Sequence, residues 1–273
     1  MLPLKYLLAQ RSLLSGGMVN TCYSLQLVDE RCYLREGSPH AHQLGINRYR
    51  ELNILQHAVV AGWAPEILHI EPETGLLVTR WVDDAPLPLD SWQTETGLQQ
   101  LGYLMASIHG SALDGTHQAM HLDMANQIRF YLARICVRSP EQTMFANKSL
   151  KMLSQLDLMD RVLCHNDINP GNLLGSKPWI VDWEYAAFGD PAFDLAVLGR
   201  NFELSTPQLT KMLCHYHDRG GYCSIERVMA MLPVVDVINL LWLAVYKACS
   251  KQPLLDSMYQ SLLERMMAEN GGW

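Results

Sequence analysis

The side chains best able to do chemistry are gathered between residues 164 and 184. His165, Asp167 and Asn172 lie in a polar segment with a Pro-Gly turn, and Asp182 follows ten residues after Asn172. Phosphoryl transfer needs one carboxylate to accept or orient a hydroxyl proton, together with hard oxygen ligands that hold Mg²⁺ across nucleotide phosphates. Asp167 is the candidate base, and Asn172 and Asp182 are the candidate magnesium ligands, because Mg²⁺ prefers amide and carboxylate oxygens.

Apolar segments flank this set of polar residues. Leu173 and Leu174 follow the loop, and the run 179–181 leads into Asp182, which predicts a strand, a loop and a second strand. Each polar residue taken singly is more often a turn or capping residue. The spacing of the whole set between apolar flanks favours the phosphotransferase interpretation over that structural one.

Other polar residues near this set are expected to support or extend it. We expect His165 to orient the loop backbone, because Mg²⁺ disfavours imidazole as a ligand. Glu184 would lie on the same side as Asp182 if the strand continued, where it could assist at the metal or bind substrate. Asp194 opens an apolar run in which an unpaired acid would be costly, so it either bonds backbone amides of the loop or caps a helix.

Residues nearer the N-terminus could hold a nucleotide. A glycine turn lets backbone N–H groups approach phosphates, because glycine has no side chain to block close contact. The residues of this turn are Ser15, Gly16 and Gly17, with Asn20 placed to brace the loop. Arg35 ends a predicted strand and could hold the α- and β-phosphates, with Glu51 as its ion-pair partner. An exposed surface pair is the alternative.

The order of predicted elements indicates two lobes of an α+β protein. The first part of the chain carries strand-like segments around one helix, and the rest is mostly helical apart from the segment 164–184. The segment 83–88 is polar and proline-bearing, as linkers are, and it separates a lobe of residues 1–82 from a lobe of residues 83–273. Strands are expected at 23–27, 31–35, 66–70 and 75–82, and helices at 46–60, 98–108, 124–135, 206–219 and 234–246.

Composition limits the class of protein. The chain of 273 residues has a net charge of −7, and it lacks the clustered Lys and Arg that a nucleic-acid binder needs. Its seven cysteines are scattered without a Cys-x-x-Cys pair, which indicates reduced thiols in the cytoplasm. The longest apolar stretch, 228–246, contains Pro233, Asp236 and Asn239, so we expect a buried helix and no membrane span. No obligate protein partner is evident.

These motifs resemble those of the aminoglycoside phosphotransferase, choline kinase and thiamine kinase superfamily, whose fold is similar to that of protein kinases. The resemblance spans nearly the whole chain and rests on residues 14–20, 33–35, 165–172, 180–186 and 189–194. It implies ATP and Mg²⁺ as cofactors, an adenine slot at a hinge near Arg80, Trp81 and Val82, and transfer to the hydroxyl of a small alcohol. Arg35 stands where protein kinases commonly have lysine, and Asp-Trp-Glu replaces their Asp-Phe-Gly, which argues against protein substrates.

One predicted helix and the length of the chain bear on the acceptor. On the helix expected at 234–246, Asp236, Trp242 and Tyr246 share a stripe, and aromatic faces beside a carboxylate suit a quaternary or ring cation. The alternative is that the two aromatic residues belong to the core and the acid pairs internally. A length of 273 residues resembles bacterial thiamine kinases more than the longer choline kinases. Thiamine is therefore the favoured acceptor, ahead of choline or ethanolamine, and of an aminoglycoside.

Two other classes of protein remain open on the sequence alone. One is a non-catalytic nucleotide-binding or scaffold protein, against which the intact base and metal positions count. The other is a thiol- or metal-dependent enzyme built on Cys214, His215 and His217, although positions i and i+2 of a helix face apart.

Overall fold

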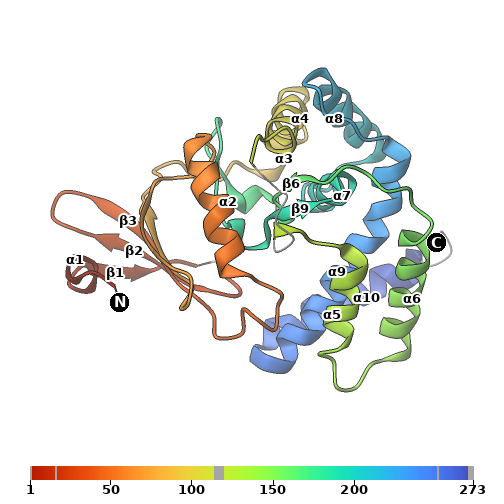
Figure 1. The fold of residues 1–273 in the computed structure, drawn as a ribbon, viewed down its shortest axis with the longest axis horizontal. Helices are drawn as coiled ribbons and strands as arrows, with labels where there is room; N and C mark the ends of the chain where they lie inside the picture. Colours follow the sequence, from red (N-terminus) through yellow and green to blue (C-terminus); the bar gives the residue numbers. More distant parts are fainter. Residues whose placement is uncertain (1, 16, 114–119, 251, 270–273) are drawn as a thin grey trace.

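Five antiparallel strands form the sheet of the N-terminal lobe in the computed structural model of the chain (Figure 1). The structure describes residues 2–15, 17–113, 120–250 and 252–269. In spatial order the strands are β1 (Gln10–Leu13), β2 (Thr21–Gln26), β3 (Arg31–Glu36), β5 (Leu76–Arg80) and β4 (Ile67–Glu71). One face of the sheet buries Leu25, Leu34 and Val78, which pack with Tyr6 of the short helix α1 (Leu4–Leu7). The opposite face of the sheet is therefore available to pack against the rest of the molecule.

The helix α2 (Arg48–Val60) lies between this sheet and the helical part of the molecule (Figure 1). It begins after Asn47, whose side chain accepts hydrogen bonds from two backbone amides of the first turn. Its first turn also buries the charged side chains of Arg48 and Glu51. A buried charge is costly unless it is paired, so this helix brings charges to the lobe boundary that must find partners there.

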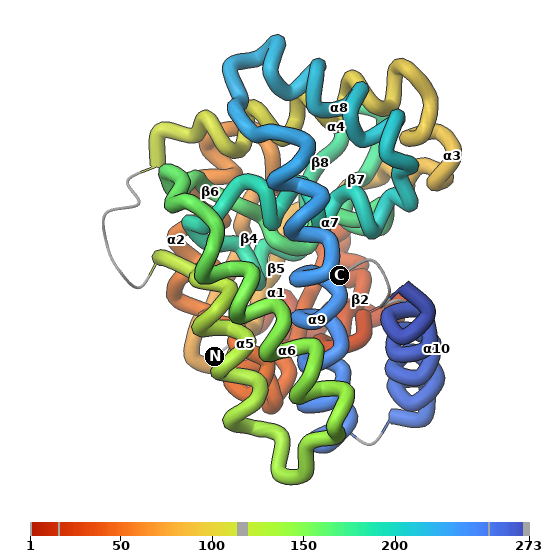
Figure 2. The backbone as a smooth tube through the Cα atoms, turned by 90° about the vertical axis from the view of Figure 1, so that its right-hand side faces the viewer, coloured from red at the N-terminus to blue at the C-terminus, as the bar shows by residue number. Residues whose placement is uncertain are grey.

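Helices make up most of the C-terminal lobe. They are α3 (Leu89–Trp92), α4 (Glu95–His109), α5 (Met124–Leu132), α6 (Pro140–Leu153), α7 (Pro191–Asn201), α8 (Thr206–Asp218), α9 (Ile225–Ser250) and α10 (Pro253–Glu269). Helices α4 and α8 lie side by side, and α9 runs through the lobe in contact with α5, α6, α7 and α10 (Figures 1 and 2).

Two short antiparallel strand pairs carry the segment that the sequence singles out. Strand β6 (Val162–Cys164) pairs with β9 (Ala187–Gly189), and β7 (Leu173–Leu174) pairs with β8 (Trp179–Ile180). Strand β6 contacts α4 and α7, so the loop that leaves it rests on both helices. The predicted order of strand, loop and strand around the motif is confirmed.

Helix α9 is the one described helix that is long and apolar enough to cross a membrane. More than half of its most apolar stretch is buried inside the protein, against α5, α6, α7 and α10. These are the surroundings of a core helix. The buried helix expected at 234–246 is confirmed as part of this longer helix, which continues through Pro233.

The other predicted elements are found close to their expected bounds, whereas α1, β1, α3, α6, α7 and α10 are not among the expected elements. All four residues of β1 are exposed, so no alternation of apolar and polar side chains reveals the strand. Helix α6 does have a local signal, because Ser139 and Gln142 form a capping box at its start.

Candidate active site

His165 lies at the start of the loop after β6, and its imidazole is fully buried. Its Nδ1 accepts a hydrogen bond from the amide of Asp167 at 3.3 Å, and its Nε2 lies 3.2 Å from the carbonyl oxygen of Val181. The ring packs on that of Trp183, with 4.7 Å between centroids. Burial lowers the pKa of His165 to about 4, so the ring is neutral and its proton sits on Nε2. Its bonds join two separate backbone segments, which is the orienting role expected from the sequence.

Asp194, in the first turn of α7, holds the same loop from the helix side. Its carboxylate accepts a hydrogen bond from the amide of His165 at 2.9 Å and another from the amide of Asn166 at 2.7 Å. The N-cap of α7 is Asp190. Of the two alternatives for Asp194, the structure therefore shows the bonds to backbone amides. Asn166 has a φ of 64°, and these bonds help to hold that left-handed turn.

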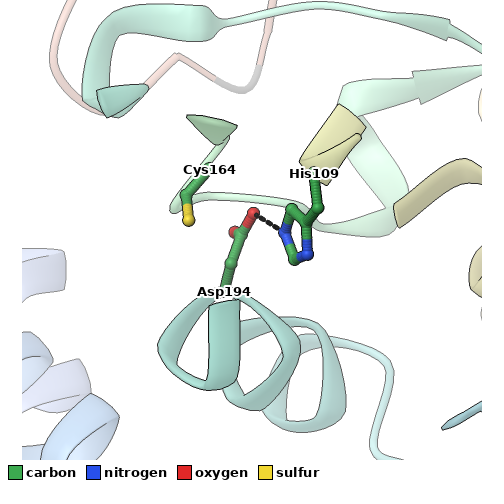
Figure 3. Close-up of side chains that lie close together, drawn as sticks. All are labelled: His109, Cys164 and Asp194. Carbon is green, nitrogen blue, oxygen red and sulfur yellow. Dashed lines mark hydrogen bonds and ion pairs between the residues drawn. The ribbon is translucent and has the colours of Figure 1, made fainter. Parts of the chain in front are cut away.

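His109 and Cys164 complete a buried cluster around Asp194 (Figure 3). His109 Nε2 lies 3.2 Å from the Asp194 carboxylate, and Nδ1 lies 2.9 Å from the hydroxyl of Tyr216. Burial raises the pKa of the Cys164 thiol well above its usual value, so the thiol stays protonated and is a poor metal ligand. The cluster supports the loop. The sequence does not reveal His109, because its bond to Asp194 spans 85 residues.

His215 and His217 of α8 bond to different neighbours. His217 Nε2 lies 2.8 Å from the carbonyl oxygen of Cys223, whereas His215 Nε2 lies 3.5 Å from the carboxylate of Glu95. Cys214 is exposed. The two imidazoles do not converge on one ligand, so the geometry does not support a thiol- or metal-dependent enzyme at these residues.

Asp167 and Asn172 lie beside one another in the loop. Asn172 Nδ2 donates to the backbone oxygen of Asp167 at 2.9 Å and to its carboxylate at 3.2 Å, and Asn169 Nδ2 donates to the same backbone oxygen at 3.1 Å. Burial raises the pKa of Asp167 to about 7, and the charge of Glu184 adds to the shift. A carboxyl group with a pKa near neutrality is well placed to exchange a proton at ordinary pH.

Asn172 and Asp182 meet at one end of the β7–β8 hairpin. The amide of Val181 donates to the carbonyl oxygen of Asn172 at 3.0 Å, so the residue before Asp182 lies directly opposite Asn172. The side-chain nitrogen of Asn172 is turned to Asp167, which leaves its Oδ1 for another partner. Within the described ranges, the carboxylate of Asp182 makes no hydrogen bond and is exposed. One amide oxygen and one carboxylate fit the donor set of Mg²⁺.

The strand that leads to Asp182 does not continue through Glu184. Strand β8 ends at Ile180, Asp182 has left-handed dihedrals (φ 64°, ψ 60°), and Trp183–Tyr185 form a turn of 3₁₀ helix. Glu184 therefore does not share a strand face with Asp182. Its buried carboxylate points to the N-terminal lobe, where it meets Arg48 at 2.8 Å.

A network of buried charges joins the two lobes at this point. Arg35 donates to both carboxylate oxygens of Glu51, at 2.5 and 3.0 Å, so the predicted ion pair is confirmed and is buried rather than exposed. Arg48 bonds Glu51 at 2.9 Å as well as Glu184, and Asn20 Nδ2 donates to Glu184 at 2.7 Å. Burial tends to lower the pKa of Arg35, but Glu51 and Glu184 raise it overall. The Arg35 guanidinium therefore remains charged. Arg48 is absent from the residues that the sequence singles out.

The glycine turn lies in the connection between β1 and β2. Ser15 and Gly17 are exposed, and Gly16 lies outside the described residues. A Cβ atom on residue 17 would lie 2.8 Å from the backbone oxygen of Asn20, so only glycine fits there without a shift. Asn20 itself is held from two sides, because its Oδ1 accepts a hydrogen bond from Arg48 at 2.8 Å.

The hinge residues Arg80, Trp81 and Val82 line one cavity of about 440 Å³. The guanidinium of Arg80 pairs with Glu66 at 2.6 Å, and that of Arg31 lies 3.7 Å from the centre of the Trp81 ring. These contacts involve only side chains. They leave the backbone of residues 80–82 and the wall of the cavity available to a ligand. The adenine slot expected here stays a prediction.

Asp236 on α9 already has two partners. Its carboxylate oxygens accept hydrogen bonds from Arg200 and Arg265, each at 2.6 Å, and the acid is 1% exposed. The internal pairing that the sequence left as an alternative is therefore present. A cationic substrate would have to displace an arginine to reach this acid.

The aromatic residues of α9 also have specific partners. Trp242 Nε1 donates to the hydroxyl of Tyr185 at 2.8 Å, and the ring of Trp242 lies 5.2 Å from that of Tyr246. The hydroxyl of Tyr246 donates to the backbone oxygen of Met18. Tyr185 is not singled out by the sequence, although it stands three residues after Asp182.

An antiparallel sheet beside a mainly helical part, with Asp167, Asn172 and Asp182 gathered on adjoining loops, is the arrangement of a kinase-like phosphotransferase. Over residues 11–242 the chain matches the phosphotransferase enzyme family, and it belongs to that family.

Known proteins of this kind include several LicA proteins. The chain is 25% identical over 197 residues to a protein LicA homolog of Metamycoplasma hominis, a match that covers 71% of this chain and 75% of the relative. The choline kinase LicA from Streptococcus pneumoniae has the same fold, with a TM-score of 0.78, 22% identity and 95% of each chain covered. A structure of LicA in complex with AMP superposes with a TM-score of 0.78 at 23% identity, covering 96% of this chain and 94% of that one. The chain is thus a member of the phosphotransferase enzyme family, and it shares its fold with these kinases.

Proposed function

We propose that the protein transfers the γ-phosphoryl group of ATP to the hydroxyl of a small quaternary-ammonium alcohol, with choline as the first candidate. The observation that carries this proposal is the aromatic pair of Trp242 and Tyr185 beside the catalytic loop. Both side chains are half-buried, and the backbone oxygen of Tyr185 accepts a hydrogen bond from Asn166 at 3.0 Å. Aromatic faces attract a cation that has no proton to donate. The similarity to LicA proteins supports the same acceptor.

The charges around these rings favour a quaternary ammonium over a primary one. The two acids suggested by the sequence for binding a cation are both engaged, Glu184 by Arg48 and Asp236 by Arg200 and Arg265. A primary ammonium group needs oxygen acceptors for its three N–H donors, whereas a trimethylammonium group needs only apolar and aromatic surface. Ethanolamine and aminoglycosides are therefore expected to be poorer acceptors than choline.

The catalytic loop supplies the remaining functions. As the hydroxyl oxygen forms its bond to the γ-phosphorus, the bond from that phosphorus to the departing ADP oxygen breaks, and the hydroxyl proton passes to Asp167. Asn172 and Asp182 would hold Mg²⁺, which neutralises phosphate charge when bound. Arg35, fixed by Glu51, would contact the phosphates beneath the glycine turn.

Thiamine, the acceptor favoured by chain length, is the second candidate. Its thiazolium ring is a cation without N–H donors, so the aromatic pair of Trp242 and Tyr185 suits it for the same reason as choline. Its larger size is the property that separates the two candidates.

An acceptor panel tests the proposal. Release of ADP is measured with ATP and Mg²⁺ and with choline, ethanolamine, thiamine or kanamycin as acceptor. We expect the highest kcat/KM for choline, and a loss of about tenfold for choline in Trp242→Leu, since a cation–π contact contributes about 1–2 kcal/mol. A higher kcat/KM for thiamine would select the second candidate. Turnover with kanamycin alone, or with none of the four, would refute both.

A further inference from the structure

The segment 17–20, called here the nucleotide loop, is bonded by side chains from the far end of the chain. The hydroxyl of Tyr246 on α9 donates to the backbone oxygen of Met18 in this loop. Gln252 Nε2 lies 3.5 Å from the same oxygen and donates to the Tyr246 hydroxyl at 3.1 Å. The residues involved are 228 and 234 positions from Met18. The N-terminal lobe is therefore tied to the C-terminal lobe at the loop expected to cover the phosphates.

The same tyrosine contacts the aromatic pair of the proposed acceptor site. Tyr246 is only 2% exposed, and its ring lies 5.2 Å from that of Trp242 at an angle of 47°. Trp242 in turn bonds the hydroxyl of Tyr185, and the backbone of Tyr185 bonds Asn166 in the catalytic loop. A continuous series of contacts thus runs from Met18 to the loop that contains Asp167.

We propose that Tyr246 and Gln252 form a latch that holds the nucleotide loop in its observed position and couples that position to the acceptor site. The part that concerns the acceptor rests on the proposed function. Tyr246 is then a positioning residue that acts through Met18, and it replaces the direct substrate contact that the sequence suggested for it. The ion pairs of Glu184 join the lobes through side chains, whereas the latch acts on the backbone of the nucleotide loop.

The physical basis of the latch is conformational entropy. A glycine-bearing loop loses more backbone freedom on ordering than other segments do, and a ligand that must order it binds more weakly. A bond to Met18 orders the loop before the nucleotide arrives. A cation between Trp242 and Tyr185 would also restrain the ring on which Tyr246 packs. Acceptor and nucleotide should therefore strengthen each other's binding by the same factor.

The substitution Tyr246→Phe tests the latch, because it removes the hydroxyl and keeps the ring. The loss of one neutral hydrogen bond is expected to weaken binding of ATP with Mg²⁺ about fivefold by calorimetry. Hydrogen exchange in peptides covering residues 14–20 should become faster, and KM for ATP should rise while kcat at saturating ATP stays near the wild-type value. Tyr259→Phe is the matched control, since that buried hydroxyl accepts from Gln142 instead of bonding the loop.

The substitution Gln252→Ala provides an independent measurement. It should weaken ATP binding less than Tyr246→Phe does, and it should have little effect when added to Tyr246→Phe, because both side chains act on one oxygen. If Tyr246→Phe matches Tyr259→Phe in ATP affinity and in loop exchange, the latch is refuted.

The coupling to the acceptor is measured separately, as ATP affinity with and without choline. Equal affinities in a wild-type protein that phosphorylates choline would refute the coupling. Failure to phosphorylate choline would refute the acceptor, whereas the latch is judged by loop exchange and ATP affinity without any acceptor.

Discussion

Replacing Arg48 with methionine should destabilise this protein far more than breaking an exposed ion pair. Arg48 bonds Glu51 at 2.9 Å and Glu184 at 2.8 Å, and the three side chains are 8%, 1% and 3% exposed. In the variant, Arg35 alone would face both carboxylates, and it lies 4.0 Å from Glu184. Removing one partner of a buried ion pair costs about 3–5 kcal/mol. Against a typical folding free energy of about 5–15 kcal/mol, this loss is large.

A double-mutant cycle in urea unfolding separates this cost from a loss of packing. Arg48→Met should lower the free energy of unfolding by about 3 kcal/mol, because Glu184 is left buried with a weaker partner. Adding Glu184→Gln removes the stranded charge, so the double variant should be at least about 1 kcal/mol more stable than the sum of the single effects. Lys211→Met, which breaks an exposed pair with Glu95, is the control and should change stability by less than about 1 kcal/mol. An Arg48→Met effect equal to the control, or strict additivity in the cycle, would show that the network does not join the lobes energetically.

Three further predictions concern the catalytic loop. Asp167→Asn should reduce kcat by about 10²–10⁴-fold while calorimetry finds ATP affinity nearly unchanged, and wild-type turnover would contradict its role as the proton acceptor. Asp182→Ala should abolish the part of nucleotide affinity that depends on Mg²⁺, measured by titration with and without the metal, and an unchanged metal dependence would argue against its role as a ligand. His165 has a folded-state pKa of about 4 against an ordinary value of 6.5, so only the unfolded chain takes up its proton between these values, and stability falls as the pH drops. Between about pH 7 and pH 5 the free energy of unfolding, measured in urea, should therefore fall by about 2 kcal/mol because of His165. This fall should be absent in His165→Gln.

The catalytic loop could be predicted because its chemistry is local in the chain. Asp167, Asn172 and Asp182 fall within sixteen consecutive residues, and the apolar pairs on either side of the loop predict the hairpin that brings the last two together. The ion pair of Arg35 and Glu51 could also be proposed, because a strand followed by a helix leaves few places for two opposite charges to meet. Its burial could not, since this depends on how the two lobes close.

The residues that the sequence missed act through contacts across long stretches of chain. Arg48 meets Glu184 across 136 residues and His109 meets Asp194 across 85, so no periodicity or spacing signals either bond. Asp236 is the opposite case, because the sequence suggested substrate binding for a residue that the structure pairs internally. Helical spacing places it on a stripe with aromatic residues, but only the packing of α7 and α10 against α9 brings its two arginines to it.

The left-handed backbone at Asp182 limits the residues that this position can accept (φ 64°). A residue with a side chain other than Asn or Asp loses about 1–2 kcal/mol in this conformation, whereas glycine adopts it freely. Replacing Asp182 with a residue other than glycine or asparagine should therefore lower thermal stability in addition to removing the proposed metal ligand. Directed evolution of this protein for heat resistance should therefore retain Asp, Asn or Gly at position 182, and only a simultaneous selection for turnover would distinguish these three residues.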